Sequence, residues 1–125
     1  MKIAKVFINE QHRLLPQQEE LLNKKFNYLE SGYIENNPYE DVPVRGWEIY
    51  SVPSTGWTKK EMEEVVSSIT DSKNKIVMVS PIPFLIREFT KKGTEVFLFH
   101  NDNREKTEKD GKIFYTVAGD GWQLI

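Results

Sequence analysis

The amino-acid sequence predicts an α/β protein in which helices cover both faces of an open, mostly parallel sheet. Apolar, β-branched segments alternate along the chain with segments of helical periodicity, as in parallel strands joined by helices. The run at residues 75–80 is almost continuously apolar, which is typical of a strand covered on both faces. Near the C-terminus, Asp110-Gly111 is a strong turn signal, and the two short strands predicted after it should pair antiparallel.

The first strand is predicted over residues 2–8, KIAKVFI, because β-branched and aromatic residues dominate there. A helix is predicted over 16–26, where apolar residues recur at spacings of three and four and Pro16 suits a first helical turn. Residues 28–44 hold closely spaced Gly, Asn and Pro residues. We therefore expect mostly loop in that range, with a short strand near Tyr33-Ile34.

The second strand is predicted over residues 47–52, which alternate apolar and polar side chains and stop at Pro53. A helix capped by Thr55 or Thr58 should follow, since apolar residues again recur at helical spacing. Its acidic residues fall on the opposite face, which we expect to be solvated; they are Glu61, Glu63 and Glu64.

The run at 75–80 is predicted to be the centre of the sheet. The helix after it is opened by Pro81 and Pro83 and stopped by Gly93, because proline suits a first turn and glycine a helix end. A further strand is predicted at 95–99, where β-branched and aromatic residues return.

Two short strands at 112–117 and 122–125 should form a C-terminal antiparallel β-hairpin that extends the sheet. The order of elements thus predicts a Rossmann-like α/β fold, with an open, mostly parallel sheet between helices. Neither a repeat nor a linker interrupts the sequence. We therefore expect a single domain over residues 1–125.

The composition excludes several classes of site. The sequence has 17 Lys+Arg and 19 Asp+Glu, a net charge of −2, so we expect no long nucleic-acid partner. It has no cysteine, which excludes disulfides and thiolate metal sites, and only two histidines, so we expect no metal and no cofactor. Because the chain lacks a long apolar run, it is predicted to be cytoplasmic, with no membrane partner.

Polar side chains follow each predicted parallel strand. In open α/β sheets, ligands bind beyond the carboxyl ends of the strands, where loops and helix N-termini converge. This rule selects residues 9–12, 51–55, 80–83 and 100–106. The candidate ligand-binding residues in these segments are Asn9, His12, Ser54, Ser80, Asn101 and Lys106.

The chemistry of these segments indicates an anionic ligand. Residues 51–56 and 80–83 directly precede predicted helices, whose N-terminal N–H groups favour phosphate, and Arg104 and Lys106 can add charge-assisted bonds. Neither a Walker-type phosphate loop nor a glycine-rich dinucleotide fingerprint follows the first strand. The sequence therefore predicts a small phosphorylated ligand other than a nucleoside triphosphate or a nicotinamide cofactor.

Each candidate also has a purely structural explanation. Ser54 and Ser80 are residues that commonly cap helices or form turns. Residues 9–12 fit an internally hydrogen-bonded loop, and Asp102-Asn103 can simply turn the chain. Trp57, beside a predicted turn, can either pack at the rim of the fold or stack on a base.

His100 and Arg104 are the candidate catalytic residues. The imidazole can act as acid or base, Asn101 can orient a substrate, and Arg104 can neutralise a pentavalent phosphate. This set suits metal-independent phosphodiester cleavage in which a neighbouring ribose hydroxyl is the nucleophile. The sequence leaves open whether a ligand is cleaved or only bound.

Three short features of the sequence occur together. They are a first strand ending in VFIN at 6–9, a Leu-x-x-x-Gln helix start at 14–18, and a basic segment with Arg104 before a Gly-Lys turn at 111–112. This combination resembles small single-domain proteins with the CRISPR-associated Rossmann fold. Some members of that family bind or cut cyclic oligoadenylate messengers. The resemblance implies a cyclic oligonucleotide ligand, an activity of ring-nuclease type and a homodimer, because two copies form the pocket for a symmetric ligand.

The sequence also fits a protein of another class. A non-enzymatic interaction or anti-defence protein could act through its C-terminal hairpin, with Tyr115, Trp122 and Ile125 as contact residues. A cleft that collects the strand-end loops would favour ligand binding. An uncovered aromatic patch on the hairpin would favour the interaction protein.

Overall fold

The computed structural model contains a five-stranded sheet with the strand order β4-β1-β5-β6-β9. It describes residues 3–32, 40–69, 74–101, 103–117 and 121–125, with the backbone alone for 28–32, 40–44, 104, 116 and 117. The strands are β1 (Ala4–Asn9), β4 (Trp47–Val52), β5 (Lys75–Met78), β6 (Val96–Asn101) and β9 (Trp122–Leu124). The first four are parallel, and β9 runs antiparallel to β6. The predicted mixed α/β class with a mostly parallel sheet is confirmed.

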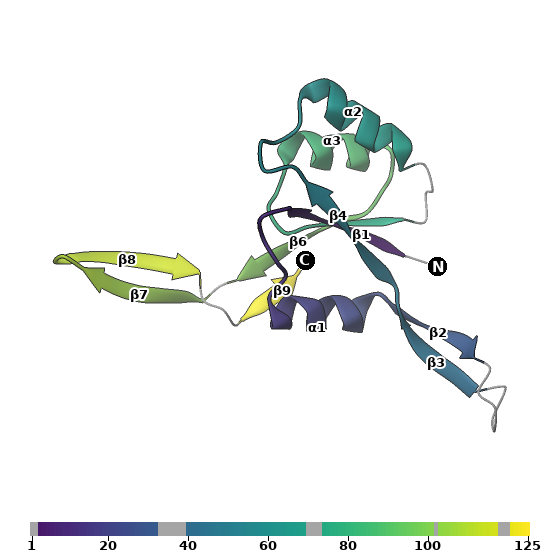
Figure 1. The fold of residues 1–125 in the computed structure, drawn as a ribbon, viewed down its shortest axis with the longest axis horizontal. Helices are drawn as coiled ribbons and strands as arrows, with labels where there is room; N and C mark the ends of the chain where they lie inside the picture. Colours follow the sequence, from purple (N-terminus) through teal and green to yellow (C-terminus); the bar gives the residue numbers. More distant parts are fainter. Residues whose placement is uncertain (1–2, 33–39, 70–73, 102, 118–120) are drawn as a thin grey trace.

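Helices lie on both faces of this sheet (Figure 1). Helix α1 (Pro16–Lys25) lies on one face, and α2 (Lys59–Ser68) and α3 (Pro83–Lys91) lie together on the other. All three are close to their predicted ranges. Thr58, and not Thr55, is the N-cap residue of α2.

The alternation of side chains along the strands divides the apolar core into two parts. On β1, Val6 packs with Leu22 and Phe26 on the α1 side, whereas Phe7 packs with Leu85 and Phe89 on the other side. Successive residues of a strand point to opposite faces, so a strand buried on both faces must be apolar throughout. The prediction that the run at 75–80 supplies the central strand is confirmed by the place of β5 in the sheet.

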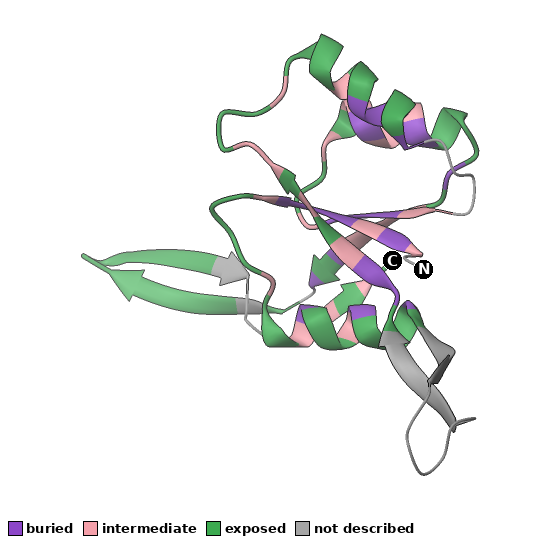
Figure 2. Ribbon diagram, turned by 45° about the vertical axis from the view of Figure 1, so that its right-hand side comes forward, coloured by how far each residue is buried: buried purple, intermediate pink, exposed green. Residues whose placement is uncertain are grey.

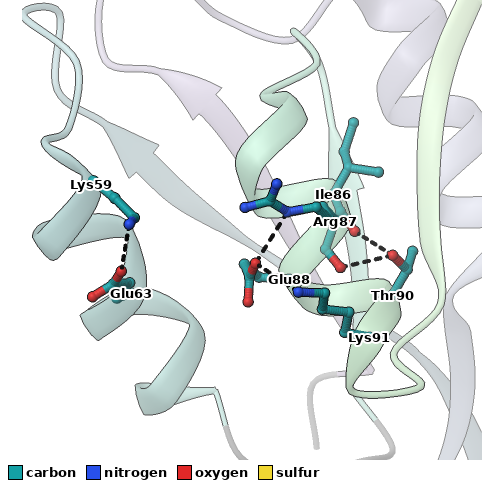
Figure 3. A network of polar contacts seen from close by, with 7 residues as sticks. All are labelled: Lys59, Glu63, Ile86, Arg87, Glu88, Thr90 and Lys91. Atoms are coloured by element: carbon teal, nitrogen blue, oxygen red, sulfur yellow. Dashed lines mark hydrogen bonds and ion pairs between the residues drawn. The ribbon is translucent and has the colours of Figure 1, made fainter.

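Charged side chains form ion pairs along α2 and along α3 (Figure 3). Lys59 and Glu63 form an ion pair along α2 at 3.8 Å, and Glu88 on α3 accepts contacts from Arg87 at 3.2 Å and Lys91 at 3.7 Å. The predicted solvated acidic face of α2 is confirmed, since Glu61, Glu63 and Glu64 are exposed. Exposed pairs of this kind contribute little to stability.

One antiparallel hairpin occupies a range predicted to be mostly loop. Strands β2 (Asn27–Gly32) and β3 (Glu40–Arg45) pair with each other, so that prediction was wrong, and the strand expected near 33–34 lies outside the described residues. Pro43 signalled a loop because it lacks an N–H. A two-stranded hairpin has two open edges, where proline breaks no ladder.

A second hairpin is formed by β7 (Arg104–Lys109) and β8 (Lys112–Val117). The turn signal is confirmed: Asp110 and Gly111 have φ values of 53° and 75°, as in the two-residue turns that suit hairpins. The predicted partner of residues 112–117 was wrong, because β8 pairs with β7 whereas β9 pairs with β6. Strand β7 was not predicted, because its charged sequence REKTEK lacks the apolar alternation of a half-buried strand. A strand exposed on both faces does not need this alternation. Figures 1 and 2 show this arm projecting from the body with most of its surface exposed.

Candidate functional site

Three loops meet at the carboxyl edge of the sheet. Strands β4, β1 and β5 are parallel neighbours, so the loops that follow them, residues 10–15, 53–58 and 79–82, leave the same edge. The chain passes from β1 to β4 on one side of β1 and then to β5 on the other side. Loops diverge at such a reversal and leave a crevice, which is the usual ligand site in open α/β sheets.

A cavity of about 390 Å³ opens at this edge, and we call it the edge cavity. Its apolar wall includes Phe7, Trp57, Met62 and Ile82. Its polar lining is formed by the side chains predicted to bind a ligand after the first three parallel strands; they are Asn9, His12, Ser54 and Ser80. The volume lies near the lower end of the range for small-molecule sites, about 300 to 1,000 Å³.

Stacked aromatic rings fix the apolar wall of the edge cavity. The ring of Phe7 stacks on Tyr50 with a centroid separation of 4.6 Å, and Trp57 meets Phe7 edge to face at 6.1 Å. Such pairs favour defined ring orientations. The indole of Trp57 is thus a preoriented wall on which a flat ligand group could stack.

Hydrogen bonds within and between the loops shape the polar rim. Asn9 Oδ1 accepts the N–H of Gln11 at 2.9 Å, and the carbonyl of Asn9 accepts the N–H of His12 at the same distance. Glu10 Oε1 accepts the N–H of Ser54 at 3.0 Å. These bonds to the Ser54 backbone and hydroxyl lower the pKa of Glu10 below its ordinary value of 4.5. Glu10 is therefore anionic at neutral pH, and its hydrogen bond joins the loop after β1 to the loop after β4 at the rim.

The two helix N-termini near the cavity differ in their capping. At α2, Thr58 Oγ1 accepts the N–H of Glu61 and Glu61 Oε1 accepts the N–H of Thr58, both at 3.2 Å, so a carboxylate already occupies this helix end. Helix α3 starts at Pro83 after Ile82, with no side-chain cap and no acidic residue in its first turn. Of these two ends, only that of α2 is closed by a side-chain cap.

Two further cavities lie on the α1 side of the same edge. One, of about 310 Å³, is lined by Leu15, Gln18 and Trp122 together with Asn9, His12, Arg13 and Ser80, and we call it the α1-side cavity. The other, of about 290 Å³, lies toward β4. Asn9 and His12 line all three cavities, which makes the end of β1 the centre of the site.

The remaining predicted site residues line none of these three cavities as described. His100 and Asn101 end β6, where His100 is exposed and paired in register with Gln123, and Asn101 is only 3% exposed. Arg104 and Lys106 belong to the projecting hairpin; Lys106 is exposed, and the side chain of Arg104 lies outside the described part of the structure. None of these four lines the edge cavity or the α1-side cavity as described.

Sequence reasoning missed most of the apolar residues of the site. The alternation in β1 could have placed Phe7 and Ile8 on opposite faces beside Asn9. Trp122 carried no local signal, because it reaches the site through a contact with α1 in which its backbone N–H donates to Gln17 Oε1 at 2.9 Å. A contact across such a long stretch of chain cannot be read from local sequence.

Searches for related proteins gave no significant match to this chain among protein-family models, curated proteins or solved structures. Within the described ranges, no cluster of three or more His, Cys, Asp or Glu side chains is arranged to hold a metal ion. No described helix is both long enough and apolar enough to cross a membrane. The functional assignment therefore rests on the geometry of the site.

Proposed function

We propose that this protein binds a small phosphorylated ligand of the nucleotide class in the edge cavity. The observation that carries the proposal is the convergence of Asn9, His12, Ser54 and Ser80, from three strand-end loops, around a cavity with an aromatic wall. Ligand sites in α/β proteins commonly combine such an apolar wall with a few polar groups at this edge of the sheet.

The cavity offers different surfaces to the two parts of a nucleotide. Trp57 supports a base through stacking, which is favourable for any nucleobase because each has a flat π-face. Ser80 and Ile82 lead into the uncapped first turn of α3, whose N–H groups favour a phosphate. The resemblance to the CRISPR-associated Rossmann fold makes cyclic oligonucleotides the first ligands to test.

A thermal-shift titration tests binding directly. AMP, cyclic di-AMP and cyclic tetra-adenylate serve as probes, and a ligand at about 100 times its Kd should stabilise the protein by about 2.7 kcal/mol. The shift should shrink in His12→Ala and Ser80→Ala, whose side chains line the cavity. Lys60→Ala is the matched control, because this exposed residue lies on α2 and does not line the edge cavity. If no probe raises the melting temperature, the proposal fails.

Cleavage of the ligand is a further part of the proposal. It assigns acid–base chemistry to His100 and charge neutralisation to Arg104, and it requires the ligand to reach the end of β6 from the edge cavity. Turnover of the bound nucleotide should persist with a chelator and be lost in His100→Ala. In His12→Ala, the main effect should be weaker binding of the nucleotide. Turnover that is unchanged in His100→Ala would remove the catalytic part and leave binding intact.

The second candidate function is protein binding through the β7–β8 hairpin. Ile113, Phe114 and Tyr115 are 52%, 48% and 67% exposed on this arm, and Ile125 is 61% exposed at the chain end. Neighbouring exposed apolar side chains of this kind often mark interaction sites.

The homodimer expected from the sequence can be tested on the same surface. If the β7–β8 hairpin forms the dimer interface, the double variant Phe114→Lys, Tyr115→Lys should be monomeric in sedimentation velocity. If the ligand pocket forms the interface, the double variant should remain a dimer.

A further inference from the structure

The edge cavity and the α1-side cavity share three residues. Asn9, His12 and Ser80 line both, and they come from the loops after β1 and β5. These strands are adjacent and parallel, and they flank the position where the strand order reverses. The two cavities are therefore neighbours across one polar saddle, which we define as Asn9, His12 and Ser80.

The cavities lie on opposite faces of the sheet. Phe7 lines the edge cavity and packs with the α2–α3 core, whereas Ile8 lines the α1-side cavity. Since successive residues of β1 point to opposite faces, the saddle crosses the end of the sheet from one face to the other. A ligand that fills both cavities must bend over this end.

Each cavity has one tryptophan in its lining. Trp57 contributes to the edge cavity and Trp122 to the α1-side cavity, and both rings are held edge to face by a phenylalanine, with Trp122 at 6.3 Å from Phe99. The Nε1 of Trp122 is buried and has no hydrogen-bond partner among the described residues.

The groups beside the saddle suit an anionic linkage. His12 lies on the saddle itself and Arg13 lines the α1-side cavity, so the basic side chains stand between or next to the two ring sites. Arginine and histidine can donate charge-assisted hydrogen bonds to phosphate oxygens. From one cavity to the other, the site therefore presents an aromatic ring, then polar and basic side chains, and then a second aromatic ring.

We infer that the ligand is a dinucleotide, with one base in each cavity and its phosphodiester linkage over the saddle. This inference rests on the proposed function and specifies the ligand of the same site. Joining the two bases makes the second contact intramolecular, so a dinucleotide should bind at least about 100-fold more tightly than the corresponding mononucleotide.

Tryptophan fluorescence can report on the two cavities separately. Trp47 is the third tryptophan, and its emission would mix with that of the two reporters. It is 2% exposed, is covered by the Arg45 guanidinium at 3.7 Å, and donates its Nε1–H to Asn23 at 2.9 Å. Trp47→Phe removes its emission. Adding Trp122→Phe leaves Trp57 as the reporter, and adding Trp57→Phe leaves Trp122. Phenylalanine preserves an aromatic ring at each position, and thermal melts of each variant verify folding.

The probes are cyclic di-AMP, cyclic di-GMP and linear ApA, compared with AMP and GMP. The inference expects at least one dinucleotide to change the emission of both reporters, with a Kd in each variant about 100-fold below that of the mononucleotide in the same variant. A change at Trp57 alone, with equal affinities for dinucleotide and mononucleotide, would overturn the inference and leave the proposed function standing. No change at either reporter, together with no thermal shift, would overturn both.

Discussion

The carboxylate of Glu10 accepts a hydrogen bond from the backbone N–H of Ser54, with an Oε1–N distance of 3.0 Å. The N–H of Glu10 in turn donates to the carbonyl of Val52 at 2.8 Å. The loop after β1 is therefore fastened to the loop after β4. Because Asn9 and Ser54 line the edge cavity, this fastening helps to set the shape of the rim.

The contribution of the hydrogen bond between Glu10 and Ser54 to stability should depend on pH. The hydrogen bonds from Ser54 lower the pKa of Glu10 below 4.5, so the ionised group stabilises the folded state above its unfolded pKa, and this contribution is lost as the pH falls through the folded pKa. We expect Glu10→Gln to lower the melting temperature at neutral pH but not in acid well below pH 4.5. Thermal melts across pH check this. Glu64→Gln, on the exposed face of α2, is the control; a pH-independent difference for Glu10→Gln would contradict the prediction.

The N-cap of α2 should contribute measurably to stability. Thr58 Oγ1 accepts the N–H of Glu61 at 3.2 Å, and loss of such a cap costs about 1 kcal/mol. Thr58→Ala should therefore reduce the free energy of unfolding by about this amount in urea titrations. Thr58→Ser keeps the hydroxyl and serves as the matched control. Equal losses in both variants would assign the effect to the methyl group instead.

Gly46 should not tolerate a side chain. A Cβ at this position would collide with the backbone carbonyl of Phe26, at the end of α1, which cannot move aside as a flexible side chain could. We expect Gly46→Ala to lower the free energy of unfolding by about 1–3 kcal/mol, the usual cost of overpacking. Ser67→Ala on the exposed face of α2 is the control, with an effect within about 0.5 kcal/mol. A Gly46→Ala variant as stable as the parent protein would contradict the close approach.

Asn101 should support the fold rather than hold the ligand of the edge cavity. Its Oδ1 accepts the N–H of Asn103 at 2.8 Å, and the residue is 3% exposed. Asn101→Ala leaves a polar group without this acceptor, so we expect a loss of about 1–3 kcal/mol in stability and unchanged nucleotide affinity. Parallel urea and fluorescence titrations separate the two effects. Weaker binding at unchanged stability would instead place Asn101 in the ligand site.

Local sequence predicted most elements because local patterns follow from local physics. The apolar spacing in α1, the alternation in β4 and the Asp110-Gly111 turn each depend on residues close in the chain. The hairpins were missed for the converse reason. The sequences of β2, β3 and β7 show little apolar alternation. The described side chains of β7 are exposed, so this strand does not have to bury a face.

The candidate site was predicted only in part, for a similar reason. Asn9, Ser54 and Ser80 follow parallel strands, so the topology alone indicated that they share an edge, and the cavity they line has that position. The segment from His100 to Lys106 was also assigned to this edge. Strand β6 is parallel to β5 and ends at Asn101, so His100 and Asn101 stand at the carboxyl end of a parallel strand, but the chain then continues into the projecting hairpin with Arg104 and Lys106.

The sequence by itself determined the type and order of the central elements, the central place of residues 75–78, and the polar character of the strand-end loops. Only the tertiary structure decided the partners of the last strands, the place of Arg104 and Lys106 on the projecting hairpin, and the contact of Trp122 with α1. The physical reason is the range of the interactions. Apolar periodicity and helix capping depend on residues that are close together in the chain. Strand pairing and the lining of a cavity depend on contacts between residues that are far apart in the chain.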